Sequence, residues 1–196
     1  MTAAAPSPAR PRRQPVVSSA VMGTLVFVAS ETMFFAAFIS AWMVVSAGAT
    51  AWPPPDQPRL PVESTAFNTA ALLASGVVLF LANRARARGD APARVSRLML
   101  AALALGAFFV VFQGYEWFRL LRYGLTMTSS TFGGFFYLIV GTHALHAVAA
   151  IVTLGIMCRR LRAGTLRDPA FHASQVFWYF VVGVWPVLYW LVYLSH

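Results

Sequence analysis

Five long apolar segments constrain the fold of this chain more than any other feature of its sequence. The hydrocarbon core of a bilayer is about 30 Å thick, so a helix that crosses it needs roughly 20 apolar residues. Inside lipid the backbone must satisfy its own hydrogen bonds, which such segments do as helices. We therefore predict an all-α fold, a polytopic membrane helical bundle of five transmembrane helices, with spans at about residues 17–46, 65–83, 98–118, 133–157 and 173–194.

The composition agrees with a membrane protein and excludes several other classes. Hydrophobic residues make up 59% of the chain and charged residues 11%, whereas soluble domains average roughly 45–50% and 25%. The net charge of +9 does not indicate nucleic-acid binding, because the basic residues form short clusters between apolar segments. The single cysteine, Cys158, cannot form an intrachain disulfide or a thiolate metal site.

The arginines are distributed unequally between the two sides of the predicted bundle. All 15 basic residues are arginine, which is typical of GC-rich coding and favours a bacterial inner (cytoplasmic) membrane. Basic loops are retained in the cytoplasm, so the N-terminus is predicted to be cytoplasmic and the C-terminus outside. Only Arg59, Arg119 and Arg122 fall on the outer side. The cytoplasmic side carries the others: Arg10, Arg12, Arg13, Arg84, Arg86, Arg88, Arg94, Arg97, Arg159, Arg160, Arg162 and Arg167.

The domain organisation is simple. Residues 1–15, rich in Ala, Pro and Arg, are predicted to be a disordered cytoplasmic tail, and residues 16–196 a single five-helix membrane domain. A targeting segment is disfavoured, because the apolar run after the tail is longer than a signal sequence. Ser64 or Thr65 is expected to cap the second span. The sequence shows no internal repeat, which counts against a transporter built by duplication.

Glu31 lies near the middle of the first span and is a candidate functional residue. An ionisable group at this depth costs roughly 2.5–3.5 kcal/mol unless it is paired or hydrated. Phe34, Phe35 and Phe38 share its helical face and are expected to surround the carboxyl group, which favours the protonated acid. Two interpretations remain open: proton or lipid-headgroup chemistry, and structural hydrogen bonding to a neighbouring helix.

His143 and His146 lie mid-span in the fourth segment, three residues apart on one helical face. Two histidines at this depth raise the question of haem or copper. The other histidines, His172 and His196, lie at opposite ends of the last span and cannot supply ligands there. We therefore predict no metal site and no catalytic residue in this chain, and interhelical hydrogen bonding for the pair.

Charged residues at the ends of the spans have simpler interpretations. Glu116 and Arg119 are predicted to form an ion pair at the outer end of the third span. Arg159 and Arg160 end the fourth span on the cytoplasmic side, where they could bind a lipid headgroup or act only as positive-inside anchors.

Several sequence motifs together resemble subunit III of the haem-copper terminal oxidases, the cytochrome c and quinol oxidases. The order and spacing of these motifs carry the resemblance, since each is weak alone. It covers residues 21–194 and is closest to the five-helix bacterial form, which lacks two N-terminal helices of longer members. The motifs are SETMFF with Glu31, FNTAALLASG (67–76), FQGYEW with Glu116, GTHALHA with His143 and His146, and FWYFVVGVW.

Two positions of the last helix depart from the family pattern Trp-His-Phe-x-Asp-x-x-Trp. Trp178 and Trp185 are kept, but Tyr179 replaces the histidine and Val182 the aspartate. Any polar link that this helix makes in the family is therefore not expected here.

The resemblance implies a non-catalytic accessory subunit of a proton-translocating oxidase. Such a subunit packs on catalytic subunit I beside the other subunits, holds phospholipid and supports proton uptake, with Glu31, His143 and His146 in a proton-path or lipid-associated role. The haems and copper then belong to the catalytic partner, and no nucleic acid is involved. Two alternatives are the accessory subunit of a nitric oxide reductase system and a small proton-linked membrane transporter.

Overall fold

The computed structural model describes residues 18–55 and 57–195, and in this part of the chain all regular structure is helical. Five helices are long and apolar enough to span a membrane, which confirms the predicted fold class. The predicted tail, residues 1–15, lies outside the described residues. The helices are α1 (Ser19–Gly48), α2 (Val62–Ala87), α3 (Pro92–Arg122), α4 (Thr131–Arg162) and α5 (Asp168–Tyr189), which continues as a π-helical turn, η1 (Trp190–Leu194).

Most of the helices extend beyond the predicted spans, because their polar ends stay helical outside the apolar windows. The helix starts follow known capping chemistry: Ser18 and Ser130 cap α1 and α4, and proline occupies the first turn of α3 and α5. The expected cap of α2 was wrong. This helix begins at Val62, and Ser64 in its first turn donates to the carbonyl of Pro61 and to Glu116 instead.

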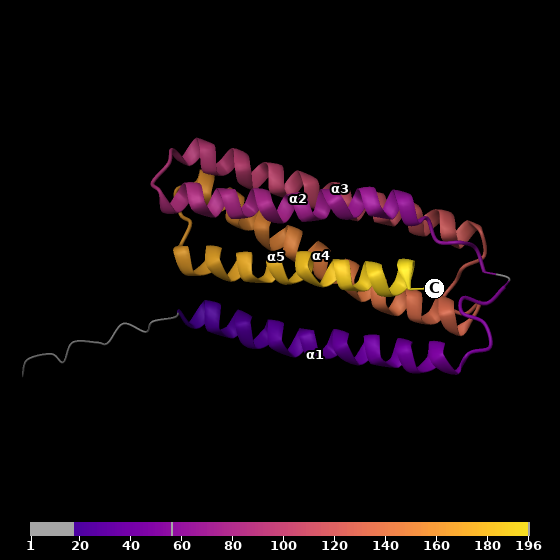
Figure 1. Cartoon of the computed structure of the whole chain (residues 1–196). Helices are drawn as coiled ribbons and strands as arrows, with labels where there is room; N and C mark the ends of the chain where they lie inside the picture. Colours follow the sequence, from indigo (N-terminus) through magenta and orange to yellow (C-terminus); the bar gives the residue numbers. More distant parts are fainter. Residues whose placement is uncertain (1–17, 56, 196) are drawn as a thin grey trace, which may run out of the picture.

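The helices form an unequal bundle (Figure 1). The α2–α3 hairpin lies on one side, α1 lies on the other, and α4 and α5 run between them. Only Phe35 and Trp42 of α1 are fully buried, and 6% of its most apolar window is buried against 44% for α2. α1 is therefore a peripheral helix whose main contacts are with α5 and, less extensively, α4.

Small residues allow the closest helix contacts. A Cβ added at Gly106 of α3 would collide with the buried ring of Trp178 of α5, so only glycine fits at this crossing. Pro186 removes one backbone donor inside α5, and the helix changes to the π form at Trp190, four residues after it. The π turn includes Tyr193, which is directed to α3: its hydroxyl accepts a hydrogen bond from Gln113 Nε2 at 3.1 Å.

Candidate functional site

The two ionisable groups Glu31 and His146 meet between α1 and α4. Glu31 Oε2 lies 3.0 Å from His146 Nε2, and the two side chains are 20% and 13% exposed. Oε2 makes no aligned hydrogen bond in this geometry, so the contact is an ion pair by distance. Glu31 is the acidic residue that the sequence placed at mid-span, and His146 is the histidine nearest to it.

A second contact fixes which nitrogen of His146 carries a proton. Its Nδ1 lies 2.8 Å from the carbonyl oxygen of Thr142, one turn earlier on α4. A carbonyl only accepts, so Nδ1 must be the protonated nitrogen of the neutral ring. Nε2 of the neutral ring is then the nitrogen that faces the Glu31 carboxyl group.

Aromatic rings surround the histidines of this site. Phe35 is buried, and its ring centroid lies 5.5 Å from that of His146 and 6.4 Å from that of His143. Phe34 is 45% exposed and packs against Phe38, with centroids 4.3 Å apart. Of the three phenylalanines expected around Glu31, Phe35 is therefore the one that packs on the histidine pair.

His143 lies in a different environment from His146. It is 1% exposed, its ring lies on Trp185 of α5 with centroids 4.9 Å apart and planes 31° apart, and its Nε2 has no hydrogen-bond partner among the described residues. Trp185 is in turn held by a 2.8 Å hydrogen bond from its Nε1 to Thr69 of α2. His143 therefore contributes ring packing rather than the expected interhelical hydrogen bond.

The end of the bundle that is predicted to be outer holds a buried polar network centred on Gln113. The Gln113 side chain accepts from Asn68 Nδ2 at 3.3 Å and donates to Tyr193, which joins α2, α3 and η1. One turn away, Glu116 is 3% exposed, accepts from Ser64 at 3.3 Å and lies 3.5 Å from Arg119. The sequence did not indicate that Asn68, Gln113 and Tyr193 are partners; its one relevant signal is the three-residue spacing of Gln113 and Glu116 on the same helical face.

The end of the bundle that is predicted to be cytoplasmic carries a basic groove. Arg159 and Arg160 are exposed and line a groove of about 350 Å³ together with Ile156 and Thr165. Among the other arginines on this side, Arg86 makes a 2.6 Å ion pair to Asp168 and Arg162 donates to Ser96 at 3.0 Å.

Metal ligands are not clustered in the described residues. No group of three or more His, Cys, Asp or Glu side chains could hold a metal ion within residues 18–55 and 57–195. The ionisable groups that the structure brings together at mid-span are the carboxyl group of Glu31 and the imidazole of His146.

Comparison with known proteins decides the family. Residues 11–195 match the sequence model of the family described as Cytochrome c oxidase subunit III. This chain belongs to that family. Similar proteins include the probable cytochrome c oxidase subunit 3 of Nocardia farcinica, 31% identical over 88% of this chain and 86% of the relative. That of Mycobacterium leprae is 32% identical over the same shares, and the subunit 3 of Pelomedusa subrufa is 33% identical over 87% of this chain and 67% of the relative.

Membership of the subunit III family confirms the resemblance inferred from the motifs, and it makes the chain part of a respiratory oxidase complex in the membrane. The two departures in the last helix also have a structural counterpart. Val182 packs against Gly76 of α2, where an added Cβ would lie 3.1 Å from its Cγ1. Tyr179 is 37% exposed on the outside of the bundle. An apolar contact therefore stands where the family pattern predicts a carboxylate.

Proposed function

We propose that this chain is a non-catalytic accessory subunit of a haem-copper respiratory oxidase in a bacterial inner membrane. It packs on catalytic subunit I, which holds the haems and copper, and it supports proton uptake during oxygen reduction. The observation that carries this proposal is the 3.0 Å contact between Glu31 and His146 inside an apolar bundle.

The contact supports a proton-handling role because it joins a carboxyl group to an imidazole rather than to a guanidinium. An ion pair with arginine keeps a carboxylate ionised, since the guanidinium does not lose its proton. An imidazole can take or return the proton, so the charge of the pair changes only when a proton enters or leaves. A group of this kind at membrane depth can hold a proton close to a partner subunit that consumes protons.

Phospholipid binding is supported by the cytoplasmic half of the bundle. Arg160 lines the basic groove, and Met157 and Thr153 follow at helical spacing on α4. Met157 and Thr153 line a second groove of about 520 Å³ between α1, α4 and α5. We propose that a phosphate group binds at Arg159 and Arg160 and that an acyl chain runs along α4 into this second groove.

The proton role is tested by a Glu31→Gln variant in the purified oxidase complex. Glutamine keeps the hydrogen-bonding shape and removes the ionisable group, so we expect intact assembly, surviving oxygen reduction and a shorter lifetime of sustained proton-coupled turnover. Glu63→Gln is the matched control, because Glu63 is exposed in the first turn of α2. If Glu31→Gln keeps the wild-type turnover lifetime and proton stoichiometry, the role of Glu31 is only structural.

The proposed partner is tested separately by purification in mild detergent. Mass spectrometry of the co-purifying subunits and a haem spectrum are expected to show a histidine-rich catalytic subunit with haem. A nitric oxide reductase partner, or a stable partner-free oligomer with transport activity, would support the alternatives instead.

The proposed orientation places the N-terminus in the cytoplasm and the C-terminus outside, in accord with the arginine distribution. A reporter fused after His196 is expected to be active only outside the cytoplasm. Activity in the cytoplasm would refute this topology.

A further inference from the structure

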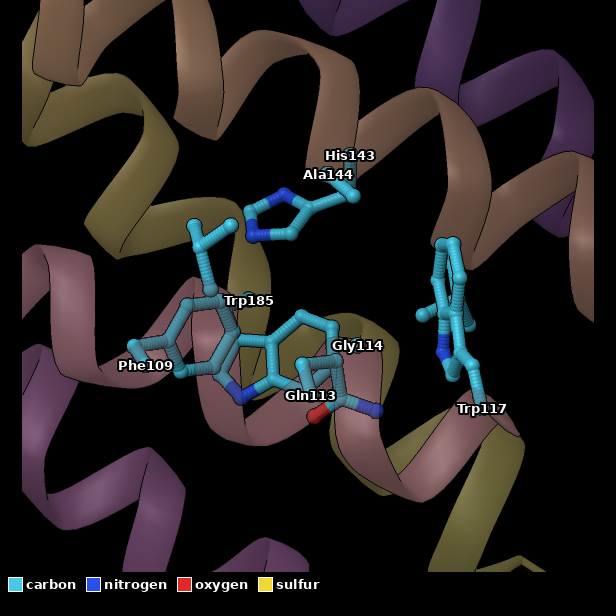
Figure 2. A pocket seen from close by; sticks show the side chains of 9 residues that line it. Phe109, Gln113, Gly114, Trp117, His143, Ala144 and Trp185 are labelled. Atoms are coloured by element: carbon cyan, nitrogen blue, oxygen red, sulfur yellow. The ribbon is translucent and has the colours of Figure 1, made fainter. Parts of the chain in front are cut away.

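We propose that a cavity between α3, α4 and α5 is an internal water site held by Trp117 and His143. The cavity has a volume of about 110 Å³. Figure 2 shows His143 of α4 and Trp117 of α3 on opposite sides of it, with Gln113 and Trp185 between them. A water molecule occupies about 30 Å³ in the liquid, so the cavity has room for a small cluster.

Two polar atoms in the cavity walls require a partner. Trp117 Nε1 and His143 Nε2 are both buried and make no hydrogen bond to the described residues. The indole nitrogen of tryptophan only donates, so it needs an oxygen that accepts, whereas the imidazole nitrogen can accept or donate. Water meets both requirements, because it accepts and donates at once.

A lipid acyl chain is the competing occupant, since most of the lining is apolar. An alkyl chain would leave the Trp117 and His143 nitrogens unpaired, at a cost of about 1–3 kcal/mol for each. The Gln113 amide bonds to Asn68 and Tyr193, and neither of the two nitrogens is hydrogen-bonded to it. The residues of the wall therefore favour water over hydrocarbon.

The position of the cavity relates the proposed water to the Glu31–His146 pair. Gly114 is exposed and Ala144 half-buried in its lining, so the cavity opens at the side of the bundle between α3 and α4. His143 is one helical turn from His146 on α4, and Phe35 contacts both rings. The site brings water to within one turn of the Glu31–His146 pair, but its existence does not depend on the role proposed for Glu31.

Trp178 serves as the comparison, because its indole lies outside this cavity. Trp178 Nε1 is also buried without a hydrogen-bond partner in the described part of the chain. Its ring is fully buried in direct contact with Gly106, and it does not line this cavity. The indole N–H of Trp178 can exchange with solvent only through local opening, whereas that of Trp117 should exchange with the water beside it.

The test follows indole N–H exchange in D₂O in the complete oxidase complex by ultraviolet resonance Raman spectroscopy. Difference spectra against Trp117→Phe and Trp178→Phe isolate the two signals. We expect Trp117 to exchange at least about tenfold faster than Trp178, the ratio that follows if local opening at Trp178 costs as little as 1.4 kcal/mol. An Ala144→Leu variant, which fills the cavity, should slow Trp117 to the rate of Trp178.

Equally slow exchange of Trp117 and Trp178 in the wild-type complex would overturn the proposal. Fast exchange of Trp117 that Ala144→Leu leaves unchanged would also overturn it, because water would then reach the indole by another route. If Ala144→Leu does not assemble, the wild-type complex is imaged by cryo-electron microscopy at a resolution that shows ordered water. Density within about 2.7–3.2 Å of Trp117 Nε1 and His143 Nε2 is expected, and acyl-chain density or an empty cavity would contradict the site.

Discussion

Glu31 and Glu116 both have little access to solvent, yet the bundle holds them in different ways. Glu31 lies on the peripheral helix α1, and its carboxyl group contacts one ionisable partner, His146. Glu116 lies on the well-packed α2–α3 hairpin, accepts from Ser64 and is close to Arg119, whose charge does not change with pH. An imidazole can exchange a proton with a neighbouring carboxyl group, whereas a guanidinium keeps its proton.

The helix packing around Glu116 also differs from that around Glu31. The outer-end network joins three helices through side-chain amides and a tyrosine hydroxyl. The mid-membrane pair joins only α1 and α4, which have few other contacts with each other. We infer that the outer network stabilises the fold and that the Glu31–His146 pair is free to serve proton chemistry.

The largest effect is expected from breaking the outer network. Gln113→Leu removes one hydrogen bond from each of Asn68 and Tyr193, so the subunit should lose about 0.5–1.5 kcal/mol of stability for each bond, or about 1–3 kcal/mol together. Asn68 Nδ2 keeps its second bond, to the carbonyl of Phe109. Gln175→Leu is the matched control: Gln175 is 3% exposed, but its Nε2 has no partner in the described structure, so the change should be neutral or stabilising. Thermal unfolding of the purified complex measures both, and equal stability of the two variants would contradict the network's role.

An intermediate effect is expected when the Glu31–His146 contact is isolated by a double-mutant cycle. Glu31→Gln and His146→Gln should show a coupling energy of about 0.5–3 kcal/mol, because the two side chains are in direct contact. The parallel cycle with His143→Gln should give a smaller value, since His143 packs on Trp185 instead. Both cycles are measured by thermal unfolding of the complex, and stronger coupling to His143 would mean that the pairing is assigned to the wrong histidine.

The smallest effect is expected from Arg119→Gln. The arginine side chain is 46% exposed and its nitrogen lies 3.5 Å from Glu116, so removing this pair should cost about 1 kcal/mol or less. Ser64 remains as a hydrogen-bond donor to the carboxylate. A loss of stability as large as that of Gln113→Leu would show that the ion pair, and not the amide network, holds the outer end together.

The sequence predicted the five helices because apolar length alone determines whether a segment can cross a bilayer. It did not predict where they end, since arginine-rich turns stay helical beyond the apolar window, as at Arg162 of α4. The cap of α2 was also missed, because Ser64 bonds to Glu116, 52 residues away. Local sequence carries no information on such a distant partner.

The candidate site was predicted only in part. The sequence identified Glu31 as a mid-span carboxyl and His143 and His146 as residues of one helical face. It could not separate the two histidines, because three residues on a helix differ by less than a full turn, and the crossing of α1 with α4 decides which one meets Glu31. The Gln113 network was missed for the same reason: its partners are 45 and 80 residues away in sequence.

The most direct test of the central claim is labelling of the intact complex with a hydrophobic carbodiimide, followed by mass spectrometry of this chain. The reagent attacks protonated carboxyl groups in apolar surroundings, so a Glu31 that shares a proton with His146 should be modified selectively. Glu116, beside Arg119, and the exposed Glu63 should remain unmodified under the same conditions. Modification of Glu116 or Glu63 to the same extent, or an unmodified Glu31, would contradict the account.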